Sequence, residues 1–307
     1  MIELIAEPQI IKTWEQFVKE NPSYSIALDG YVSGPPMYDD KGPKLNLNHH
    51  EGIYRLATRS VSAQAYLSIK VGLIDKFREN NEERVNIYVN DPDQDVCLAV
   101  WLLRNYKKIS KPREEPLVER LVEIEDKLDT TAGTYPINPE SDIMKKIAWV
   151  FKPYTDARFA GNLEKMNSID MKNLIDKVSN RIDYYFSGKC EKLEPDTRYE
   201  KVYKGKNWIM VNEIGAHART KLFWDGVKAF VSVKERQDGN YNYILGKMSP
   251  FIPFPIEMFY KELNTIEGLL NDIDRWGGSD TIGGSPRQKG SRIKPKELRK
   301  LIDTLIR

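Results

Sequence analysis

The sequence predicts an α/β protein, with a parallel, doubly wound sheet in the N-terminal domain and a smaller α+β C-terminal domain. In the first half of the chain, short β-like runs alternate with helix-like runs, a pattern typical of a parallel sheet. The second half opens with a series of strand-like segments and ends in helices. The length of 307 residues also favours two domains, because a single core rarely grows beyond about 250–300 residues.

Strands and helices are expected to alternate in the first half. The expected strands are short and apolar, and they span residues 25–29, 45–48 and 84–90. The expected helices span residues 60–80, 96–103 and 114–128. The second of these is apolar throughout, which predicts a helix buried against the sheet. The third would bury one face, formed by Leu117, Leu121, Ile124 and Leu128.

A polar, turn-rich segment at 187–207 marks the expected boundary between a domain at 1–190 and a domain at 200–307. The strands expected beyond it are WIMVNE, VKAFVSVKER and YNYILGK, with QDGN as a hairpin turn between the last two. A helix to about Leu270, a Gly-rich loop at 277–290 and a last helix opened by Pro295 complete this domain.

Composition excludes several classes of protein. Forty-seven basic and 45 acidic residues give a net charge of +2, which excludes a polycation held to nucleic acid by bulk charge. No apolar run reaches the roughly 18 residues of a membrane span. The N-terminus has neither the basic segment nor the cleavage site of a secretory signal. With only Cys97 and Cys190, a disulfide scaffold is not expected, and we expect a cytoplasmic protein.

Chemistry-bearing residues follow the ends of three expected strands. Asp29 ends the first, His49 and His50 end the second, and Asp91, Asp93 and Asp95 follow the third. Ligands of open α/β sheets bind at the carboxyl ends of strands, so these side chains are expected to share one rim. Confined carboxylates repel one another, and a bound cation removes that repulsion. Carboxylate and imidazole ligands suit manganese, magnesium, iron or zinc.

Each of these motifs also has a structural interpretation. Asp91 or Asp93 could cap the helix that follows, and capping alone is the commoner use of an Asp after a strand. A His pair at a strand end is more often a surface or core feature than a ligand pair. The coincidence favours a site, because the chain has only three histidines and two of them are adjacent at a strand end.

The segments NHHEG and PDQDVCLAVWLL resemble the DHH phosphoesterase superfamily, which includes single-strand-specific exonucleases and cyclic-dinucleotide phosphodiesterases. Pro92-Asp93-Gln94-Asp95, followed by small and apolar residues, matches its first motif, and Asn48-His49-His50 matches two positions of its Asp-His-His triplet. The resemblance covers about residues 25–130. It departs in motif order, since the His pair comes first, and in Val89, which stands where the family has a His. Asn48 departs as well: it can replace Asp if that residue orients a neighbouring His, but not if its charge is needed.

The resemblance implies a site with two divalent ions, manganese before magnesium, and a substrate that is a nucleotide or a short single-stranded nucleic acid. Asp29 would bridge the ions. The further ligands it implies are Asp93, Asp95, His49 and either Asp126 or Asp129. His50 would contact the substrate phosphate, and a metal-activated hydroxide would attack phosphorus without a separate general base.

Two segments are candidates for binding phosphate. Arg55 and Arg59 lie four apart, which on a helix would make a clamp, although solvated helix charge explains them equally well. The glycine-rich stretch 275–293 could aim backbone N–H groups at a phosphate, or could be a mobile linker. Its candidate phosphate-binding residues are Gly283, Gly284, Ser285 and Arg287.

Three functional hypotheses follow. The first is a metal-dependent phosphoesterase acting on a nucleotide or a short oligonucleotide, since the near-neutral charge argues against a long duplex. The second is a catalytically inactive protein on the same fold that binds a phosphate or nucleotide. The third is a two-domain interaction protein whose acids are helix caps. The oligomeric state is left open.

Overall fold

The structure, a computed structural model, describes every residue except 81, 114, 273 and 307. The chain divides into two compact units. The first unit is formed by Met1–Thr130 and Asp142–Glu194, and the second by Thr131–Ser141 and Pro195–Arg307. Residue 114, the first of one expected helix, lies outside the described residues.

The first unit is built on a five-stranded sheet in the order β1-β7-β2-β4-β3. Its strands are β1 (Ile2–Ala6), β2 (Ser25–Leu28), β3 (Met37–Asp39), β4 (Lys44–Leu47) and β7 (Val85–Val89). The neighbouring strands β1, β7, β2 and β4 pair in parallel, and β3 pairs antiparallel with β4 at the edge. Every residue of β2 and β7 is buried. A mixed α/β fold with parallel strands is thus confirmed, with an antiparallel edge strand that the sequence pattern did not indicate.

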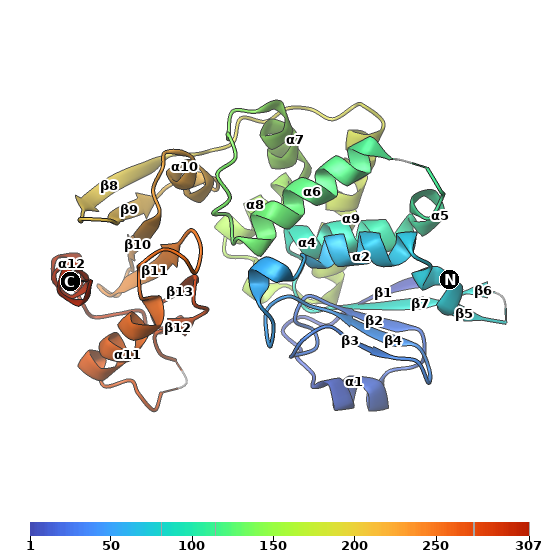
Figure 1. The fold of residues 1–307 in the computed structure, drawn as a ribbon, viewed down its shortest axis with the longest axis horizontal. Helices are drawn as coiled ribbons and strands as arrows, with labels where there is room; N and C mark the ends of the chain where they lie inside the picture. The colour runs from blue at the N-terminus through green and yellow to red at the C-terminus, as the bar shows by residue number, and fades with distance from the viewer. Residues whose placement is uncertain (81, 114, 273, 307) are drawn as a thin grey trace. The chain divides into compact units, whose positions relative to one another are not determined.

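Helices cover both faces of this sheet (Figure 1). On one face lies α1 (Trp14–Glu20), whose Phe17 packs against Ala27, Tyr31 and Tyr88. On the other face lie α2 (Val61–Lys70), α4 (Gln94–Arg104) and α6 (Pro116–Thr130). The remaining elements of the unit are α3 (Leu73–Lys76), β5 (Arg78–Glu79), β6 (Glu82–Glu83), α5 (Tyr106–Ile109), α7 (Asp142–Val150), α8 (Lys152–Phe159) and α9 (Ser168–Phe186), with 3-10 turns at Arg55–Ala57 and Leu163–Lys165.

Helix α4 is buried as its apolar run predicts, since every residue from Val96 to Leu103 is at most 2% exposed. The expected face of α6 is correct for Leu121 and Ile124, which are buried, and wrong for Leu117, which is 46% exposed. Leu117 lies in the first turn of α6, where the helix only begins to pack.

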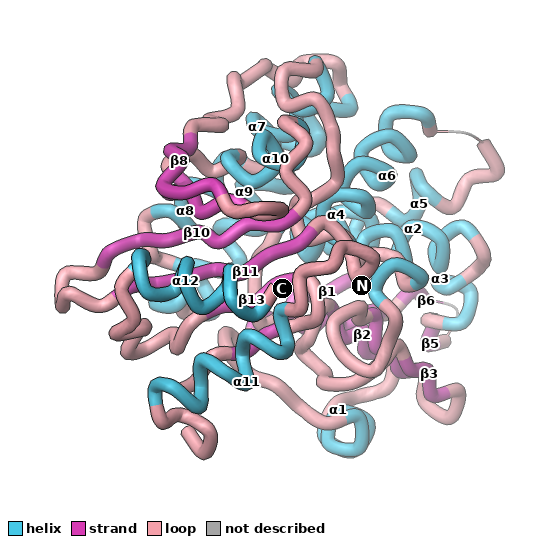
Figure 2. The backbone as a smooth tube through the Cα atoms, turned by 60° about the vertical axis from the view of Figure 1, so that its left-hand side comes forward, coloured by secondary structure: helices cyan, strands magenta, loops and turns pink. Residues whose placement is uncertain are grey.

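The second unit is built on a six-stranded sheet in the order β12-β13-β11-β10-β9-β8. Its strands are β8 (Tyr199–Lys204), β9 (Ile209–Glu213), β10 (Ala229–Glu235), β11 (Tyr241–Lys247), β12 (Gly277–Gly278) and β13 (Ile282–Gly284). Its helices are α10 (Ala218–Trp224), α11 (Ile256–Glu267) and α12 (Pro295–Leu305). Successive residues of β10 face opposite ways: Val231 packs with α11 and α12, and Phe230 with α10. In Figure 2, α11 and α12 cross in front of this sheet.

The hairpin between β10 and β11, the helix α11 and the Pro295 start of α12 agree with the sequence pattern. Two differences matter. Strand β8 lies inside the segment 187–207, and β12 and β13 lie inside the stretch expected to be a Gly-rich loop.

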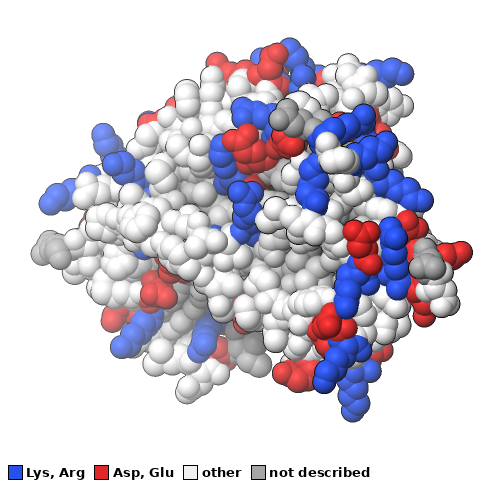
Figure 3. Space-filling view, turned by 45° about the vertical axis from the view of Figure 1, so that its right-hand side comes forward, with Lys and Arg blue, Asp and Glu red and all other residues white. Residues whose placement is uncertain are grey.

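Within the described residues, no helix is both long and apolar enough to cross a membrane. Figure 3 shows Lys and Arg interspersed with Asp and Glu over the face drawn, in keeping with the net charge of +2.

Candidate metal centre

The candidate site lies where three neighbouring parallel strands end. Asp29 follows β2 and His49 follows β4 by two residues, while Asp93 caps the helix that comes after β7. Because β2 pairs with both β4 and β7 in parallel, the carboxyl ends of all three lie at one edge of the sheet. Asp29 has a left-handed backbone with φ of +47°, a conformation that Asp tolerates better than most residues do.

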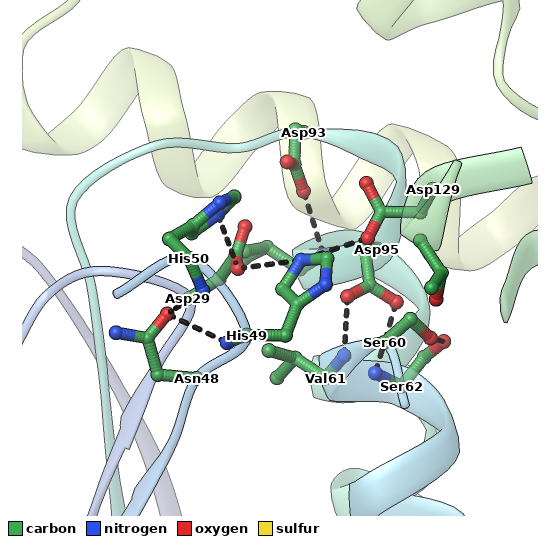
Figure 4. Close-up of polar contacts among 12 residues, drawn as sticks. Asp29, Asn48, His49, His50, Ser60, Val61, Ser62, Asp93, Asp95 and Asp129 are labelled. Carbon is green, nitrogen blue, oxygen red and sulfur yellow. Dashed lines mark hydrogen bonds and ion pairs between the residues drawn. The ribbon is translucent and has the colours of Figure 1, made fainter. Parts of the chain in front are cut away.

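The side chains of four residues point toward one another at this edge of the sheet (Figure 4): His49, His50, Asp29 and Asp129. The Nε2 atom of His49 lies between the two carboxylates. This atom lies 2.8 Å from Oδ2 of Asp129 and 3.3 Å from Oδ1 of Asp29. The Nε2 atom of His50 lies 2.8 Å from the same Asp29 oxygen. His49 is fully buried, whereas the side chain of His50 is 42% exposed.

These close contacts pair carboxylates with imidazoles, but those of His49 with Asp29 and Asp129 do not have hydrogen-bond geometry. Nε2 of His49, Oδ1 of Asp29 and Oδ2 of Asp129 are buried and have no hydrogen-bond partner. Two ligands about 2.1 Å from one ion and at right angles to each other would lie about 3.0 Å apart, close to the separations seen here. Buried ligand atoms that converge without hydrogen bonds between them have the chemistry and spacing of a ligand set for a divalent cation.

Two overlapping groups of residues could each hold an ion. One is Asp29, His49 and His50, and the other is His49, Asp95 and Asp129; in each group the ligand atoms lie within 4.8 Å of one another. His49 therefore belongs to both groups, where the sequence analysis placed Asp29 between the ions. Since Nε2 has a single lone pair, it serves one ion at a time, and a bridged pair would still need a shared carboxylate.

The electrostatics of the cluster favour a cation. Burial disfavours the charged form of Asp29, but His49 and His50 hold the pKa of its carboxyl far below the usual range. Burial likewise opposes charge on His49, but the Asp129 and Asp29 carboxylates raise its pKa to about 10. Burial, with Asp129 and Asp29 nearby, raises the pKa of Asp95 to about 7. Burial and the neighbouring acids raise the pKa of Asp93 well above its ordinary value.

Asp93 and Asp95 also act as helix caps. Oδ1 of Asp93 accepts a 2.8 Å hydrogen bond from the Val96 N–H and so caps α4. The two oxygens of Asp95 accept from the Val61 and Ser62 N–H groups at 2.5 and 2.9 Å, at the start of α2. The capping interpretation is therefore correct for Asp93. Asp95, despite these bonds, also stands in one ligand group, because a carboxylate oxygen keeps a second lone pair.

Of the two acids expected as alternatives, Asp129 belongs to one ligand group and Asp126 to neither. Oδ1 of Asp126 accepts from the Ser60 N–H at 2.7 Å. Its other oxygen lies 3.7 Å from the guanidinium of Arg59. One helical turn of α6 separates the two acids, so the helix aims Asp129 at His49 and Asp126 at the start of α2.

Arg55 and Arg59 do not share a helix, so that part of the expectation is wrong, while phosphate binding by either residue remains a prediction. Arg55 begins a 3-10 turn, and Arg59 lies beyond that turn, just before the Ser60 cap of α2. Arg55 donates to the backbone carbonyls of Asp129 and Thr130 at 2.8 and 2.9 Å. It thereby binds the C-terminal end of α6, where a cation is favourable.

The chain around Val89, which stands where the resembled family has a His, adds no residue to either ligand group. Val89 is buried in β7. The Asn90 amide donates to the Ile10 and Gly30 carbonyls at 2.8 and 3.1 Å, and Asp91 lies outside both ligand groups.

Packing in the second unit accounts for the glycines of the 275–293 stretch. A Cβ atom on Gly283 would lie 2.0 Å from Oη of Tyr260, and one on Gly284 would lie 2.4 Å from the Tyr243 carbonyl oxygen. Ser285 is buried, and its Oγ accepts from the Tyr243 N–H at 3.0 Å. The glycines thus allow β13 to pair with β11, so the segment is neither a free loop nor a linker in this part of its length.

Backbone N–H groups of the same stretch do converge on an anion, and that anion is Asp274. Its carboxylate accepts from Gln288 and Lys289 at 3.0–3.2 Å. Burial disfavours its charge slightly, but these N–H groups and that of Arg287 hold the pKa of Asp274 below its ordinary value. Arg287 itself is exposed. Phosphate binding by Gly283, Gly284, Ser285 and Arg287 remains a prediction.

The sequence analysis missed Arg158, an exposed residue of α8. Burial and Asp29 raise the pKa of Asp91, and the Arg158 charge lowers it, which places this cation within electrostatic range of the acidic rim. Among the described residues, none forms a hydrogen bond or ion pair with its guanidinium. Its position four residues after Tyr154 gave no sequence signal, since α8 itself was not expected.

Comparisons with protein-family models, with curated proteins and with solved structures find no match to this chain.

Proposed function

We propose that this protein is a metal-dependent phosphoesterase whose first unit holds the metal. The observation that carries the proposal is the convergence of three buried ligand atoms that have no hydrogen-bond partner: Nε2 of His49, Oδ1 of Asp29 and Oδ2 of Asp129. Carboxylate and imidazole donors suit manganese, with magnesium as the alternative. The motif resemblance to DHH phosphoesterases supports the same function, and we propose that the chain is a divergent member of that superfamily.

The residues of the site would have different roles in binding metal and substrate. His49, Asp29, Asp129 and Asp95 would hold the cation, which when bound supplies Lewis acidity and a water of lowered pKa. His50 is part exposed beside Asp29 and would contact the substrate phosphate. Arg158, which has no described partner, would add positive charge for an anionic substrate.

We propose a nucleotide or a short single-stranded oligonucleotide as the substrate. A phosphate ester supplies the anion that a cation, an imidazole and a guanidinium would attract. The balanced net charge of +2 supplies no extended field for holding a long duplex.

The test is manganese binding by equilibrium dialysis, followed by turnover of bis(p-nitrophenyl) phosphate and of a 5′-phosphorylated dinucleotide. We expect the wild-type chain to bind manganese and to hydrolyse at least one of these, and Asp29→Asn to lose both properties. Asp176→Asn is the matched control, because this exposed carboxylate pairs only with Arg104 in the described structure. It should behave as wild type.

Other outcomes would contradict the proposal in distinct ways. Metal binding without turnover of either substrate, or of a wider nucleotide set, would favour the inactive phosphate-binding protein. Absence of manganese and magnesium binding would favour the interaction protein whose acids serve as caps.

A further inference from the structure

Asn48 lies immediately before the two site histidines and uses both ends of its amide. The residue is 1% exposed. Its Nδ2 group donates to the carbonyls of Val32 and Gly34 at 3.2 and 2.8 Å. Its Oδ1 atom accepts from the N–H groups of His49 and His50 at 2.8 and 3.2 Å (Figure 4). All four hydrogen bonds join it to backbone.

These bonds join the two segments that carry the site. Val32 and Gly34 lie in the loop that follows Asp29, whereas His49 and His50 follow β4. A further bond supports the same junction, since the Gly34 N–H donates to Glu51 at 2.9 Å. The amide of Asn48 therefore fixes the backbone on which the His49 and His50 rings approach Asp29.

We infer that Asn48 is a positioning residue of the metal site, and that its amide cannot be replaced by a carboxylate. The part of this inference that concerns metal binding rests on the proposed function, whereas the positioning of the histidine backbone does not. An Asp would keep the acceptor for the two histidine N–H groups, but it would lose both donors. Its second oxygen would then face two carbonyl oxygens in a buried place, close to the other acids of the site.

The inference opposes the view that Asn48 is the remnant of a lost acidic residue. On that view, restoring Asp to the triplet Asn48-His49-His50 would improve the site. On ours, the same substitution weakens it, because the position is built for a group that both donates and accepts. One variant, Asn48→Asp, separates the two views.

The experiment measures manganese affinity and turnover of wild type, Asn48→Asp and Asn48→Ala. We expect both variants to bind manganese at least about tenfold more weakly, the lower end of the loss typical of residues that orient metal ligands. Asn46→Asp is the matched control. Asn46 is also buried and donates to the same loop, at the Pro35 carbonyl, but it makes no bond to either histidine. Its metal affinity should fall much less.

Two further readouts separate positioning from general destabilisation. At saturating Co²⁺, the visible spectrum of Asn48→Asp should differ from wild type, and that of Asn46→Asp should not. In metal-free protein, hydrogen exchange at the His49 and His50 amides should accelerate in Asn48→Ala but not in Asn46→Ala. This second readout tests the positioning role even if the wild-type chain binds no metal, which would contradict only the proposed function.

Tighter metal binding or faster turnover in Asn48→Asp would overturn the inference, as would an unchanged affinity. Should Asn48→Asp fail to fold, Asn48→Thr replaces it. A hydroxyl can satisfy only part of the four bonds, so weaker binding is again expected and wild-type binding would overturn the inference.

Discussion

The Nε2 atom of His49 and the Oδ2 atom of Asp129 lie 2.8 Å apart, and neither has a hydrogen-bond partner. His49 follows a strand, and Asp129 lies in the last turn of α6. The pair therefore exists only because α6 ends over the edge of the sheet where β4 ends. This long-range contact adds a carboxylate to the candidate ligand set, which the strand-end residues alone would not supply.

Asp129→Asn should weaken manganese binding by roughly 100-fold or more, exceeding the 10–100-fold loss typical of residues that only orient ligands. Asp126→Asn, one helical turn away, should leave affinity within about threefold of wild type, since an Asn oxygen can still accept from the Ser60 N–H. Calorimetric titration of both variants measures this. Equal losses in the two variants would show that α6, rather than the Asp129 carboxylate, matters.

Manganese affinity should rise with pH between 6 and 8. In the metal-free protein, burial opposes charge on His49, but the Asp129 and Asp29 carboxylates raise its pKa to about 10, so the ring is a cation throughout this window. A metal ligand must be neutral imidazole, so each ion bound releases about one proton and affinity gains roughly tenfold per pH unit. Near pH 6, Asp95 adds to the release, because burial together with Asp129 and Asp29 raises its pKa to about 7. Titration in buffers of different ionisation enthalpy counts the protons, and a pH-independent affinity would contradict the assignment of His49.

The folding stability of the metal-free protein should change with pH in the opposite direction to the manganese affinity. A raised pKa of His49 means that the native metal-free protein binds its proton more tightly than the unfolded chain does. This stabilisation is complete below the unfolded value of about 6.5 and is lost as pH rises toward 10. Metal-free protein should therefore unfold at progressively lower temperature from pH 7 to pH 10, whereas His49→Gln should not show this part of the trend.

Short-range patterns were enough to locate much of the fold and the strand-end residues. Strands β2, β4 and β7 follow from apolar and β-branched runs, and buried α4 follows from a continuous apolar run. Parallel pairing then brings Asp29 and His49 to one edge. These features depend on local composition and on a general rule of sheet geometry, so one sequence suffices to predict them.

The predictions that failed depend on the rotation of helices about their axes and on contacts between residues far apart in the sequence. Choosing Asp129 over Asp126 requires the rotation of α6 about its axis, which two acids three residues apart do not reveal. Arg55 binds the end of α6 through backbone carbonyls, which a sequence does not display. The glycines of β13 are needed because the Tyr260 side chain and the Tyr243 backbone carbonyl, which belong to other elements, approach them closely.

Arg55→Ala should lower the free energy of unfolding by about 1–2 kcal/mol, because it removes two hydrogen bonds to the last carbonyls of α6. Metal affinity should fall with it, since Asp129 lies in that turn. Arg59→Ala is the control: this side chain is 63% exposed and makes one 3.7 Å ion pair, so a change within about 0.5 kcal/mol is expected. Urea denaturation with metal titration measures both. A raised KM with unchanged stability in Arg55→Ala would instead restore its interpretation as a phosphate clamp.

Gly283→Ala should destabilise the second unit by about 1–3 kcal/mol, the usual cost of forcing an extra methyl group into a packed site. The new Cβ would lie 2.0 Å from Oη of Tyr260 and 2.3 Å from the carbonyl oxygen of Gly277, and a backbone oxygen cannot rotate away as a side chain can. Gly277→Ala is the matched control in the paired strand, because a Cβ there meets nothing within 4 Å. It should change stability by no more than about 0.5 kcal/mol. Thermal and urea unfolding of both variants measure the difference. Equal stability of the two variants, with loss of phosphate binding only in Gly283→Ala, would show that this glycine is kept for a ligand; the expected inequality shows that it is kept for the close approach of β13 to Tyr260.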